Sequence, residues 1–253
     1  MSIVTNFRDL GGIQNRHGQH LRAQRLLRSA ELSQLSAAEA CLLVQDYCLN
    51  KIVDLRSEEE VRQRPDRRIA GTGYVHIDLL AEARQMAQAS VAAFSRLDSS
   101  SKTHEYMLAL YQELALSPAA QAGYQRFFQE LLNLPAQGSV LFHCAAGKDR
   151  TGIAAMLILE TLEVARPLIY QDYLQTNRLR QQENARLLAQ AAAAGADPAQ
   201  QAAFGIALQV DSRYLDRFYT TVEQHYGSVN GYLQSAIGLD RHSKRQLQQQ
   251  YLG

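Results

Sequence analysis

One ten-residue segment constrains this chain more than any other, namely His143-Cys-Ala-Ala-Gly-Lys-Asp-Arg-Thr-Gly152. An apolar run at 139–142 precedes it and a helical pattern opens at Gly152, so the sequence predicts a buried strand, a tight loop and a helix. The backbone N–H groups of such a loop converge at the helix N-terminus, where a phosphate dianion is stabilised. The fold must therefore place this loop at the end of a buried strand.

Two side chains frame the loop, because Cys144 opens it and Arg150 closes it. The positive field of the loop favours the thiolate form of Cys144, which we expect to be a nucleophile. The planar guanidinium of Arg150 matches two phosphate oxygens and would stabilise the charge that develops on them. Ala145, Ala146 and Gly147 would contribute backbone amides. Together, Cys144 and Arg150 predict removal of a phosphoryl group through a phosphocysteine.

Two other interpretations of the loop fail on its residues. A nucleotide-binding loop needs a glycine five residues before its Gly-Lys pair and Ser or Thr after the lysine, but this chain has Phe142 and Asp149 there. A metal site would need more thiols or histidines nearby, and the adjacent His143 and Cys144 would point apart along a strand. We therefore expect neither a metal nor a cofactor.

The loop resembles the signature of the cysteine-dependent protein tyrosine phosphatase superfamily. Its ending is similar to that of the bacterial tyrosine/serine phosphatases that also dephosphorylate phosphoinositides. Five further segments stand in the order of that family: Asn6-Phe-Arg-Asp-Leu-Gly-Gly12, Leu27-Arg-Ser-Ala30, Ile52-Val-Asp-Leu-Arg-Ser57, Asp172-Tyr-Leu-Gln-Thr-Asn177 and Gly227-Ser-Val-Asn-Gly-Tyr-Leu233. The resemblance covers nearly the whole chain. It implies an α/β fold of the protein tyrosine phosphatase type, with a central, mostly parallel sheet flanked by helices and a helical lid.

The chain has 253 residues and 46% hydrophobic content, which predicts one domain over 1–253 with a sizeable core. Local signals place most of the elements, among them capping boxes at Ser36-Ala-Ala-Glu39 and Ser57-Glu-Glu-Glu60 and a turn at His17-Gly18. We expect a hairpin over 11–29, a helix over 36–47, a strand over 51–55, a short helix from 57 that Pro65 ends, a strand over 74–77, mostly helical structure over 79–134 with breaks near 98–102 and 117–118, and a helix from Pro167.

Residues 178–208 form a separate pattern. A long Ala- and Gln-rich helix is expected over 178–194, Gly195-Ala-Asp-Pro198 breaks it, and a second helix follows to about Leu208. Two readings stand side by side, a helical hairpin packed on the domain and a lid over the site. The family carries a helical lid at this point in the chain.

The resemblance also implies roles for individual residues. Asp149 would be the general acid, as in the lipid-active members of the family, and His143 would order the loop by hydrogen bonding. The chain has no tryptophan, so the mobile Trp-Pro loop that supplies the acid in many tyrosine phosphatases is absent in its usual form. Asp78 matches the position of that loop and is the alternative acid. Thr151 would donate to the Cys144 sulfur or cap the helix.

Other charged residues have two readings each. Lys148 would contact a second phosphate or acidic group, or be solvated. Charges beside apolar residues need buried partners, so we expect a network that supports the loop from Arg8, Asp9, Asp54 and Arg56. A basic cluster at Arg62, Arg64, Arg67 and Arg68 would be a solvated face or a contact with anionic lipid headgroups.

Charge and cysteine content exclude several classes of protein. A net charge of +1 argues against a nucleic-acid-binding protein, and three widely spaced cysteines do not suggest disulfides. No apolar stretch is long enough to span a membrane, and the N-terminus lacks the pattern of a cleaved signal peptide. The expected location is the cytoplasm, with export without a cleaved signal left open.

These observations predict a phosphomonoester hydrolase acting on phosphotyrosine, phosphoserine/threonine and/or phosphoinositides, or on a small soluble phosphate. The alternative is a non-catalytic module that binds phosphate or phosphoinositide. Because Cys144, Arg150 and Asp149 are all present, the enzyme is favoured.

Overall fold

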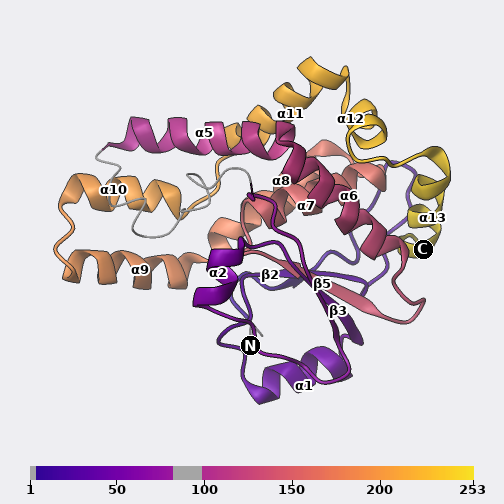
Figure 1. The fold of residues 1–253 in the computed structure, drawn as a ribbon, viewed down its shortest axis with the longest axis horizontal. Coiled ribbons are helices and arrows are strands. Elements are labelled where there is room, and N and C mark those ends of the chain that lie inside the picture. The colour runs from indigo at the N-terminus through magenta and orange to yellow at the C-terminus, as the bar shows by residue number, and fades with distance from the viewer. Residues whose placement is uncertain (1–3, 82–98) are drawn as a thin grey trace.

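A five-stranded sheet organises the computed structural model, which describes residues 4–81 and 99–253. Its strands are β1 (Arg8–Asp9), β2 (Leu26–Ser29), β3 (Leu49–Asp54), β4 (Gly73–His76) and β5 (Ser139–His143), in the spatial order β1-β2-β5-β3-β4. The pairs β2–β5, β5–β3 and β3–β4 are parallel, and β1 is antiparallel to β2. The predicted α/β fold with a mostly parallel sheet is confirmed (Figure 1).

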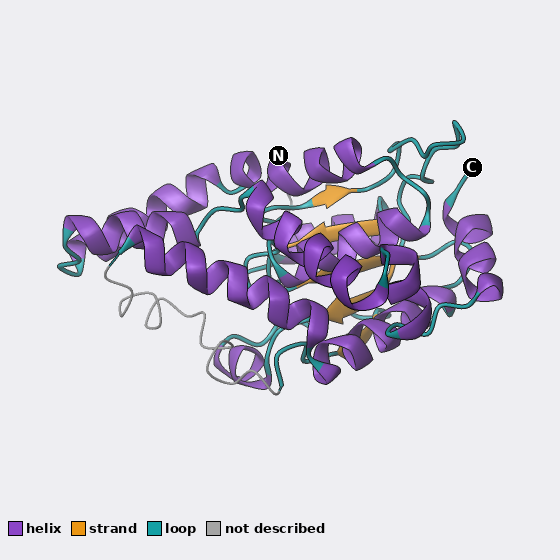
Figure 2. Ribbon diagram, turned by 90° about the horizontal axis from the view of Figure 1, so that it is seen from above, coloured by secondary structure: helices purple, strands orange, loops and turns teal. Residues whose placement is uncertain are grey.

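Both faces of the sheet are buried, as parallel sheets require. Along β5, Val140 and Phe142 belong to the larger core cluster and Leu141 to a smaller one on the other face, as the two-residue period of a strand dictates. The smaller cluster consists of Leu27, Leu32, Leu35, Leu43, Leu49, Ile52 and Leu141. It lies under α1 (Ala37–Gln45), while most of the other helices cover the opposite face (Figures 1 and 2).

The described helices are numbered with the gaps that Figure 1 shows. They are α1, α2 (Glu58–Gln63), α5 (Ser100–Leu116), α6 (Pro118–Leu132), α7 (Arg150–Thr161), α8 (Arg166–Leu179), α9 (Gln181–Ala193), α10 (Pro198–Ala207), α11 (Ser212–Tyr226), α12 (Val229–Ser235) and α13 (Arg241–Tyr251). Both predicted capping boxes are present, Ser36 with Glu39 at α1 and Ser57 with Glu60 at α2. None of these helices is long and apolar enough to cross a membrane.

Two local predictions are corrected by the structure. The hairpin predicted over 11–29 is found close to its turn at Gly18, where Gln14 pairs antiparallel with His20, but strand β2 at its end pairs with Arg8–Asp9. The helix predicted over 178–194 is broken at Arg180, between α8 and α9, because this residue leaves helical geometry with φ −102° and ψ 0°. The part of the 79–134 prediction that falls on 82–98 lies outside the described residues.

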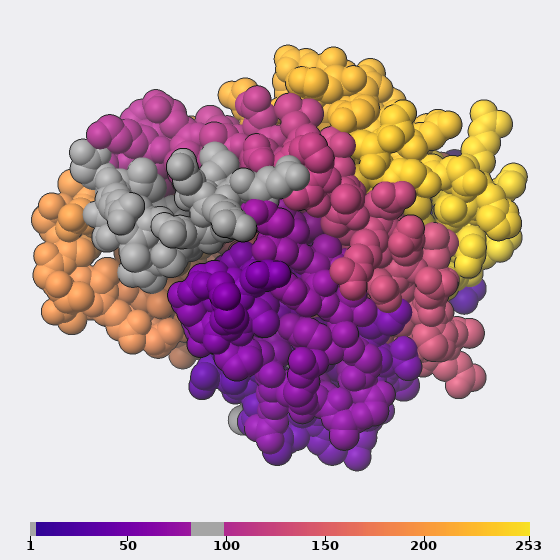
Figure 3. Space-filling model, viewed as in Figure 1, coloured from indigo at the N-terminus to yellow at the C-terminus, as the bar shows by residue number. Residues whose placement is uncertain are grey.

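The helices α9 and α10 form a hairpin that extends beyond the sheet beside α5, at the opposite end of the molecule from the C-terminal helices (Figures 1 and 3). Phe204, Ala207 and Leu208 are buried in a small apolar cluster there. The chain returns to the domain at Val210, whose N–H and C=O both bond the side chain of Asn177 at 2.8 and 2.9 Å. The hairpin is therefore fastened to the domain at its base.

Candidate active site

The Cys144 loop, residues 144–150, leaves the carboxyl end of β5 and leads directly into α7. The neighbouring parallel strands β2 and β3 end beside it at Ser29 and Asp54, which pair in register with β5. Ligands of parallel α/β sheets bind at this edge, where loops at the strand ends meet. The order of the strands thus places the predicted loop at the centre of the edge.

The loop carbonyls are bound from outside the loop. The oxygen of Ala145 accepts from the backbone N–H of Glu31 at 3.2 Å. The oxygen of Ala146 accepts from the Asn6 amide at 3.2 Å and from Nη1 of Arg180 at 3.0 Å. Segments far apart in the chain therefore hold the same turn of backbone.

The next carbonyl, of Gly147, accepts from the Asn6 amide at 2.8 Å and from Nη2 of Arg28 at 3.0 Å. In a trans peptide the C=O and the following N–H point in opposite directions. Outward carbonyls therefore turn the N–H groups of Ala146, Gly147 and Lys148 toward the inside of the loop. These amides donate no hydrogen bond within the described chain, so they are available to an anion.

Gly147 is required by the backbone itself. Its φ is +67°, and a Cβ built there would lie 2.2 Å from the backbone oxygen of Ser29. Any side chain would be both strained and in collision with β2.

The loop opens into a cavity of about 780 Å³. Cys144, Lys148, Asp149 and Arg150 line it, and so do Leu187 and Phe204 of the α9–α10 hairpin, among others. Cys144 itself is 2% exposed, whereas Cys41 and Cys48 are on the surface. The cavity is thus the place where the predicted nucleophile, arginine and acid come together.

Glu60 holds the guanidinium of Arg150. Its two carboxylate oxygens accept from Nη1 and Nη2 at 2.6 and 2.7 Å. Burial disfavours the charge on Arg150, but Glu60 outweighs burial, so the pKa of Arg150 is raised. The same carboxylate completes the capping box of α2 by accepting from the N–H of Ser57 at 2.8 Å. The arginine is thereby fixed to the start of a helix.

A second buried carboxylate, Asp172 on α8, supports the loop from the other side. It pairs with Nε of Arg8 at 2.6 Å and with Nη1 of Arg28 at 2.5 Å. Arg8 also donates to Oδ1 of Asn6 at 2.7 Å, which orients the Asn6 amide toward the loop carbonyls. Burial and the nearby Arg28 lower the pKa of Arg8 to about 10, with Asp172 opposing them. The pKa of Asp172 is lowered, because its two arginines outweigh burial.

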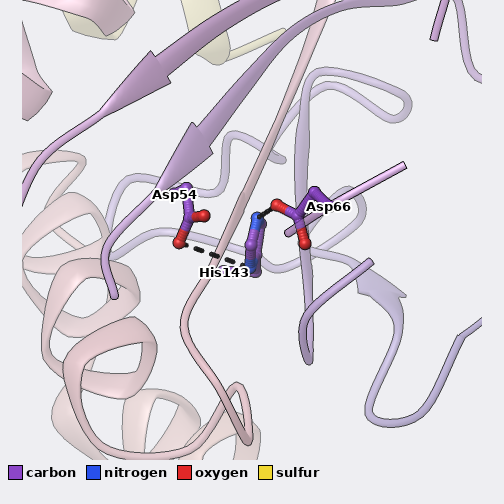
Figure 4. Close-up of side chains that lie close together, drawn as sticks. All are labelled: Asp54, Asp66 and His143. Atoms are coloured by element: carbon purple, nitrogen blue, oxygen red, sulfur yellow. Dashed lines mark ion pairs between the residues drawn. The ribbon is translucent and has the colours of Figure 1, made fainter. Parts of the chain in front are cut away.

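His143, directly before the nucleophile, lies between Asp54 and Asp66 (Figure 4). Its Nε2 is 2.9 Å from Oδ2 of Asp66, and its Nδ1 is 3.9 Å from Oδ1 of Asp54. Burial lowers the pKa of His143, but these two carboxylates outweigh it and the net pKa is raised. His143 is therefore held between two carboxylates directly behind the loop.

These three residues could in principle ligate a cation. Arg56, however, donates Nε and Nη2 to both oxygens of Asp54 at 2.6 to 3.1 Å, and its Nη2 lies 3.0 Å from Asp66. Arg56 thus supplies positive charge to both carboxylates. The donor set fits an ion-pair cluster and does not fit a metal centre.

The single network expected from the sequence is in fact two. Arg8 belongs with Asp172, whereas Asp54 and Arg56 belong with His143. Asp9 belongs to neither, because its carboxylate accepts from the backbone N–H groups of Gly11 and Gln24 at 2.8 and 2.6 Å. The prediction that Asp9 belongs to this network was wrong, because Asp9 stabilises a turn after β1, at the end of the strand away from the Cys144 loop.

Asp149 directly precedes α7, and its carboxylate has two hydrogen-bonding partners. Its Oδ1 accepts from the hydroxyl of Tyr111 at 2.8 Å, and its oxygens lie 2.9 and 2.7 Å from Nζ of Lys148. Burial, Asp149 and the neighbouring Tyr173 raise the pKa of Tyr111, which keeps it a donor. Asp78 is not among the described residues that line the cavity. Its carboxylate accepts from the backbone N–H of Glu58 at 3.2 Å.

Thr151 makes neither of its predicted contacts. Its hydroxyl is buried and bonds to nothing within the described residues, whether sulfur or backbone. The basic cluster is also dispersed, since Arg62 pairs with Glu59, Arg64 with Glu31, and Arg68 lies over the ring of Tyr74. Arg67 donates to the carbonyl of Leu35 at 3.1 Å.

Sequence reasoning missed several residues of the site. Asn6, Arg28 and Asp172 stood in segments that carried the family resemblance, but nothing assigned them a role. Glu60 was recognised only as a helix cap. Asp66, Tyr111 and Arg180 gave no local signal at all, because their partners lie far away in the chain.

Comparisons with known proteins agree with this geometry. The model of the tyrosine phosphatase family matches residues 1–253, and the chain belongs to that family. A tyrosine-protein phosphatase of Cupriavidus necator is 33% identical over 94% of this chain and 83% of its own length. The triple specificity protein phosphatase PtpB of Mycobacterium tuberculosis is 30% identical over 91% of each chain. The protein is a cysteine-dependent phosphatase of the tyrosine phosphatase type.

Among solved structures, a cysteine-to-serine variant of TpbA from P. aeruginosa, bound to phosphotyrosine, overlaps 61% of this chain and 70% of its own. The TM-score is 0.34 and the identity 15%.

The Asp172 pairs should be essential for stability. Asp172→Asn keeps the shape but leaves two buried arginines without their carboxylate, and we expect a loss of about 3–5 kcal/mol in the free energy of unfolding. Urea denaturation measures it. Asp211→Asn is the control, because it removes a 2.6 Å pair with Arg213 on the surface and should cost ~1 kcal/mol or less. Equal losses would contradict the supporting role of Asp172.

The Glu60 carboxylate should matter for activity through Arg150. Glu60→Gln keeps an oxygen for the Ser57 cap but removes the charge, so kcat/KM on para-nitrophenyl phosphate should fall by about tenfold or more. The control is Glu59→Gln, whose partner Arg62 is exposed. A Glu60→Gln enzyme as active as the Glu59→Gln enzyme would show that Arg150 needs no partner.

Proposed function

We propose that this phosphatase hydrolyses phosphomonoesters through a phosphocysteine formed on Cys144. The observation that carries the proposal is the Cys144 loop itself, in which a buried thiol precedes three carbonyls, those of Ala145, Ala146 and Gly147, that are held outward. Its inward amides and Arg150 make a cradle for a tetrahedral dianion.

In the first step the Cys144 thiolate attacks phosphorus in line with the ester oxygen. The S–P bond forms, the P–O ester bond breaks, and Asp149 gives its proton to the leaving oxygen. Glu60 takes one N–H each of Nη1 and Nη2 of Arg150, and Nη1 also donates to the carbonyl of Leu55 at 3.4 Å. Nε and the second N–H of Nη2 remain for two phosphate oxygens. Charge that builds on those oxygens is stabilised by these N–H groups of Arg150 and by the loop amides.

In the second step water attacks the phosphocysteine. Asp149, now a carboxylate, takes the proton from the water, the S–P bond breaks, and orthophosphate leaves with the thiolate restored. Tyr111 and Lys148 hold the Asp149 carboxylate between the two steps. Asp149 is preferred to Asp78 as the acid because it lines the cavity with Cys144.

The substrates proposed are phosphotyrosine, phosphoserine/threonine and phosphoinositides. The name of the mycobacterial relative, a triple specificity phosphatase, supports a broad choice. A cavity of about 780 Å³ leaves room for more than a phosphate group. The α9–α10 hairpin, which lines that cavity, is proposed as its lid.

Replacing the nucleophile should separate turnover from binding. Cys144→Ser should abolish hydrolysis of para-nitrophenyl phosphate, while binding of orthophosphate, measured by calorimetry, should survive because the amides and Arg150 remain. In the native enzyme, rapid denaturation during turnover of radiolabelled substrate should leave label on the peptide containing Cys144. Turnover by Cys144→Ser would exclude the phosphocysteine. Label and turnover both missing from the native protein would favour the non-catalytic binding module.

The two acid candidates differ in how they respond to the leaving group. Asp149→Asn should cost roughly 10²–10⁴-fold on phosphoserine, whose alkoxide needs a proton, and distinctly less on para-nitrophenyl phosphate. Asp78→Asn is the control and should do little. Steady-state kcat values of both variants on both substrates distinguish the two candidates. Equal losses on good and poor leaving groups would make Asp149 a structural residue, and leaving-group dependence in Asp78→Asn alone would transfer the role to Asp78.

A further inference from the structure

Arg180 is a buried arginine whose charge has no carboxylate partner in the described chain. It stands at the junction of α8 and α9 and is 4% exposed. Only Nη1 is bonded, to the carbonyl of Ala146 at 3.0 Å. Its Nε is buried with no acceptor, and no bond is recorded for Nη2 to any described residue.

The other buried arginines near the site each have a carboxylate partner, although Nε of Arg28 has no acceptor among the described residues. Arg8 and Arg28 share Asp172, Arg56 has Asp54, and Arg150 has Glu60. Away from the site, Arg25 also lacks a carboxylate, but its Nη1 donates to the carbonyls of 135, 136 and 138. A guanidinium has five N–H donors, and burying its charge unpaired is costly. Arg180 is therefore under-satisfied in comparison with these neighbours.

The location of Arg180 indicates what would satisfy it. The residue lines the same cavity as Cys144 and contacts the loop through Ala146, two residues after the nucleophile. Burial lowers the pKa of Arg180, and the nearby Glu183, Cys144 and Asp149 oppose this without closing an ion pair. Glu183 is already bonded to Arg186 at 2.7 and 2.9 Å.

On this side of the cavity two further arginines are already paired, Arg64 with Glu31 and Arg186 with Glu183, so the excess positive charge is that of Arg180. Arg64 and Arg186 line the cavity together with Arg180, and all three act on the one carboxylate of Glu183, whose pKa they help to lower. The inward amides of the Cys144 loop are a separate set of donors, on the other face of the peptide whose carbonyl Arg180 binds. A phosphate held by those amides therefore leaves Nη2 of Arg180 available to a second group, whereas its Nε is buried.

We propose that Arg180 forms a second anion-binding subsite, which takes a second phosphate on the same substrate molecule as the phosphate held by the Cys144 loop. This inference rests on the proposed function, and it narrows the substrate class to phosphomonoesters with a second phosphate nearby. Binding at the subsite would satisfy a guanidinium that the fold itself leaves with one hydrogen bond.

The test uses non-hydrolysable probes, the α,ω-alkane bisphosphonates from ethane to hexane, each compared with the monophosphonate of the same chain. Their affinities are measured by calorimetry on Cys144→Ser and as inhibition constants on the native enzyme. At one spacer length the bisphosphonate should bind tighter than its monophosphonate by about tenfold or more, the value of a charge-assisted hydrogen bond. Because the calorimetric arm needs no turnover, it can succeed even where the proposed chemistry fails.

Three variants decide the role of Arg180. In Arg180→Gln the ratio of bisphosphonate to monophosphonate affinity should fall to about one, even if the lost bond to the Ala146 carbonyl weakens both ligands, and in Arg180→Lys part of the gain should return. The matched control is Arg178→Gln, which removes the same charge from an exposed arginine outside the cavity lining and should keep the gain. A gain that is absent at every spacer, or that survives Arg180→Gln, overturns the subsite. Equal weakening of mono- and bisphosphonates in both Arg180 variants also overturns it, because Arg180 would then only support the loop.

Discussion

The carbonyl oxygens of Ala145, Ala146 and Gly147 each accept a hydrogen bond from a donor outside the Cys144 loop. Because the peptide is planar and trans, that outward bonding directs the amides inward. A loop of this length has no regular structure to do the same, and unbound carbonyls would be free to turn toward the anion and repel it. The positive field at Cys144 therefore depends on donors that bond the outer side of the loop.

Those donors need supports of their own, which explains the charges buried around the site. The Asn6 amide is aimed by Arg8, and Arg8 is held by Asp172. Behind the nucleophile, the His143 ring lies between Asp54 and Asp66. Each of these groups is thus held by a partner on the side that faces away from the loop. On the near side the guanidinium of Arg180 is left open, and that of Arg150 is only partly occupied.

The sequence predicted those elements that depend on residues close together in the chain. The strand, loop and helix around Cys144 follow from local pattern, and so do the capping boxes at Ser36 and Ser57. It did not predict pairs such as Arg8 with Asp172, which are 164 residues apart, because charge alone does not say which carboxylate the topology will bring near. Asp9 shows the same limit, since it stands beside Arg8 yet bonds a turn instead.

The donors that hold the loop come from residues 6, 28, 31 and 180, and so from both halves of the chain. The loop can acquire its shape only when these distant segments have already met, a late event for contacts of such long sequence separation. By linkage, an anion bound in the loop favours the native state of all of them together. Phosphate in the buffer would thus act on the folding equilibrium of the whole domain through one short turn of backbone.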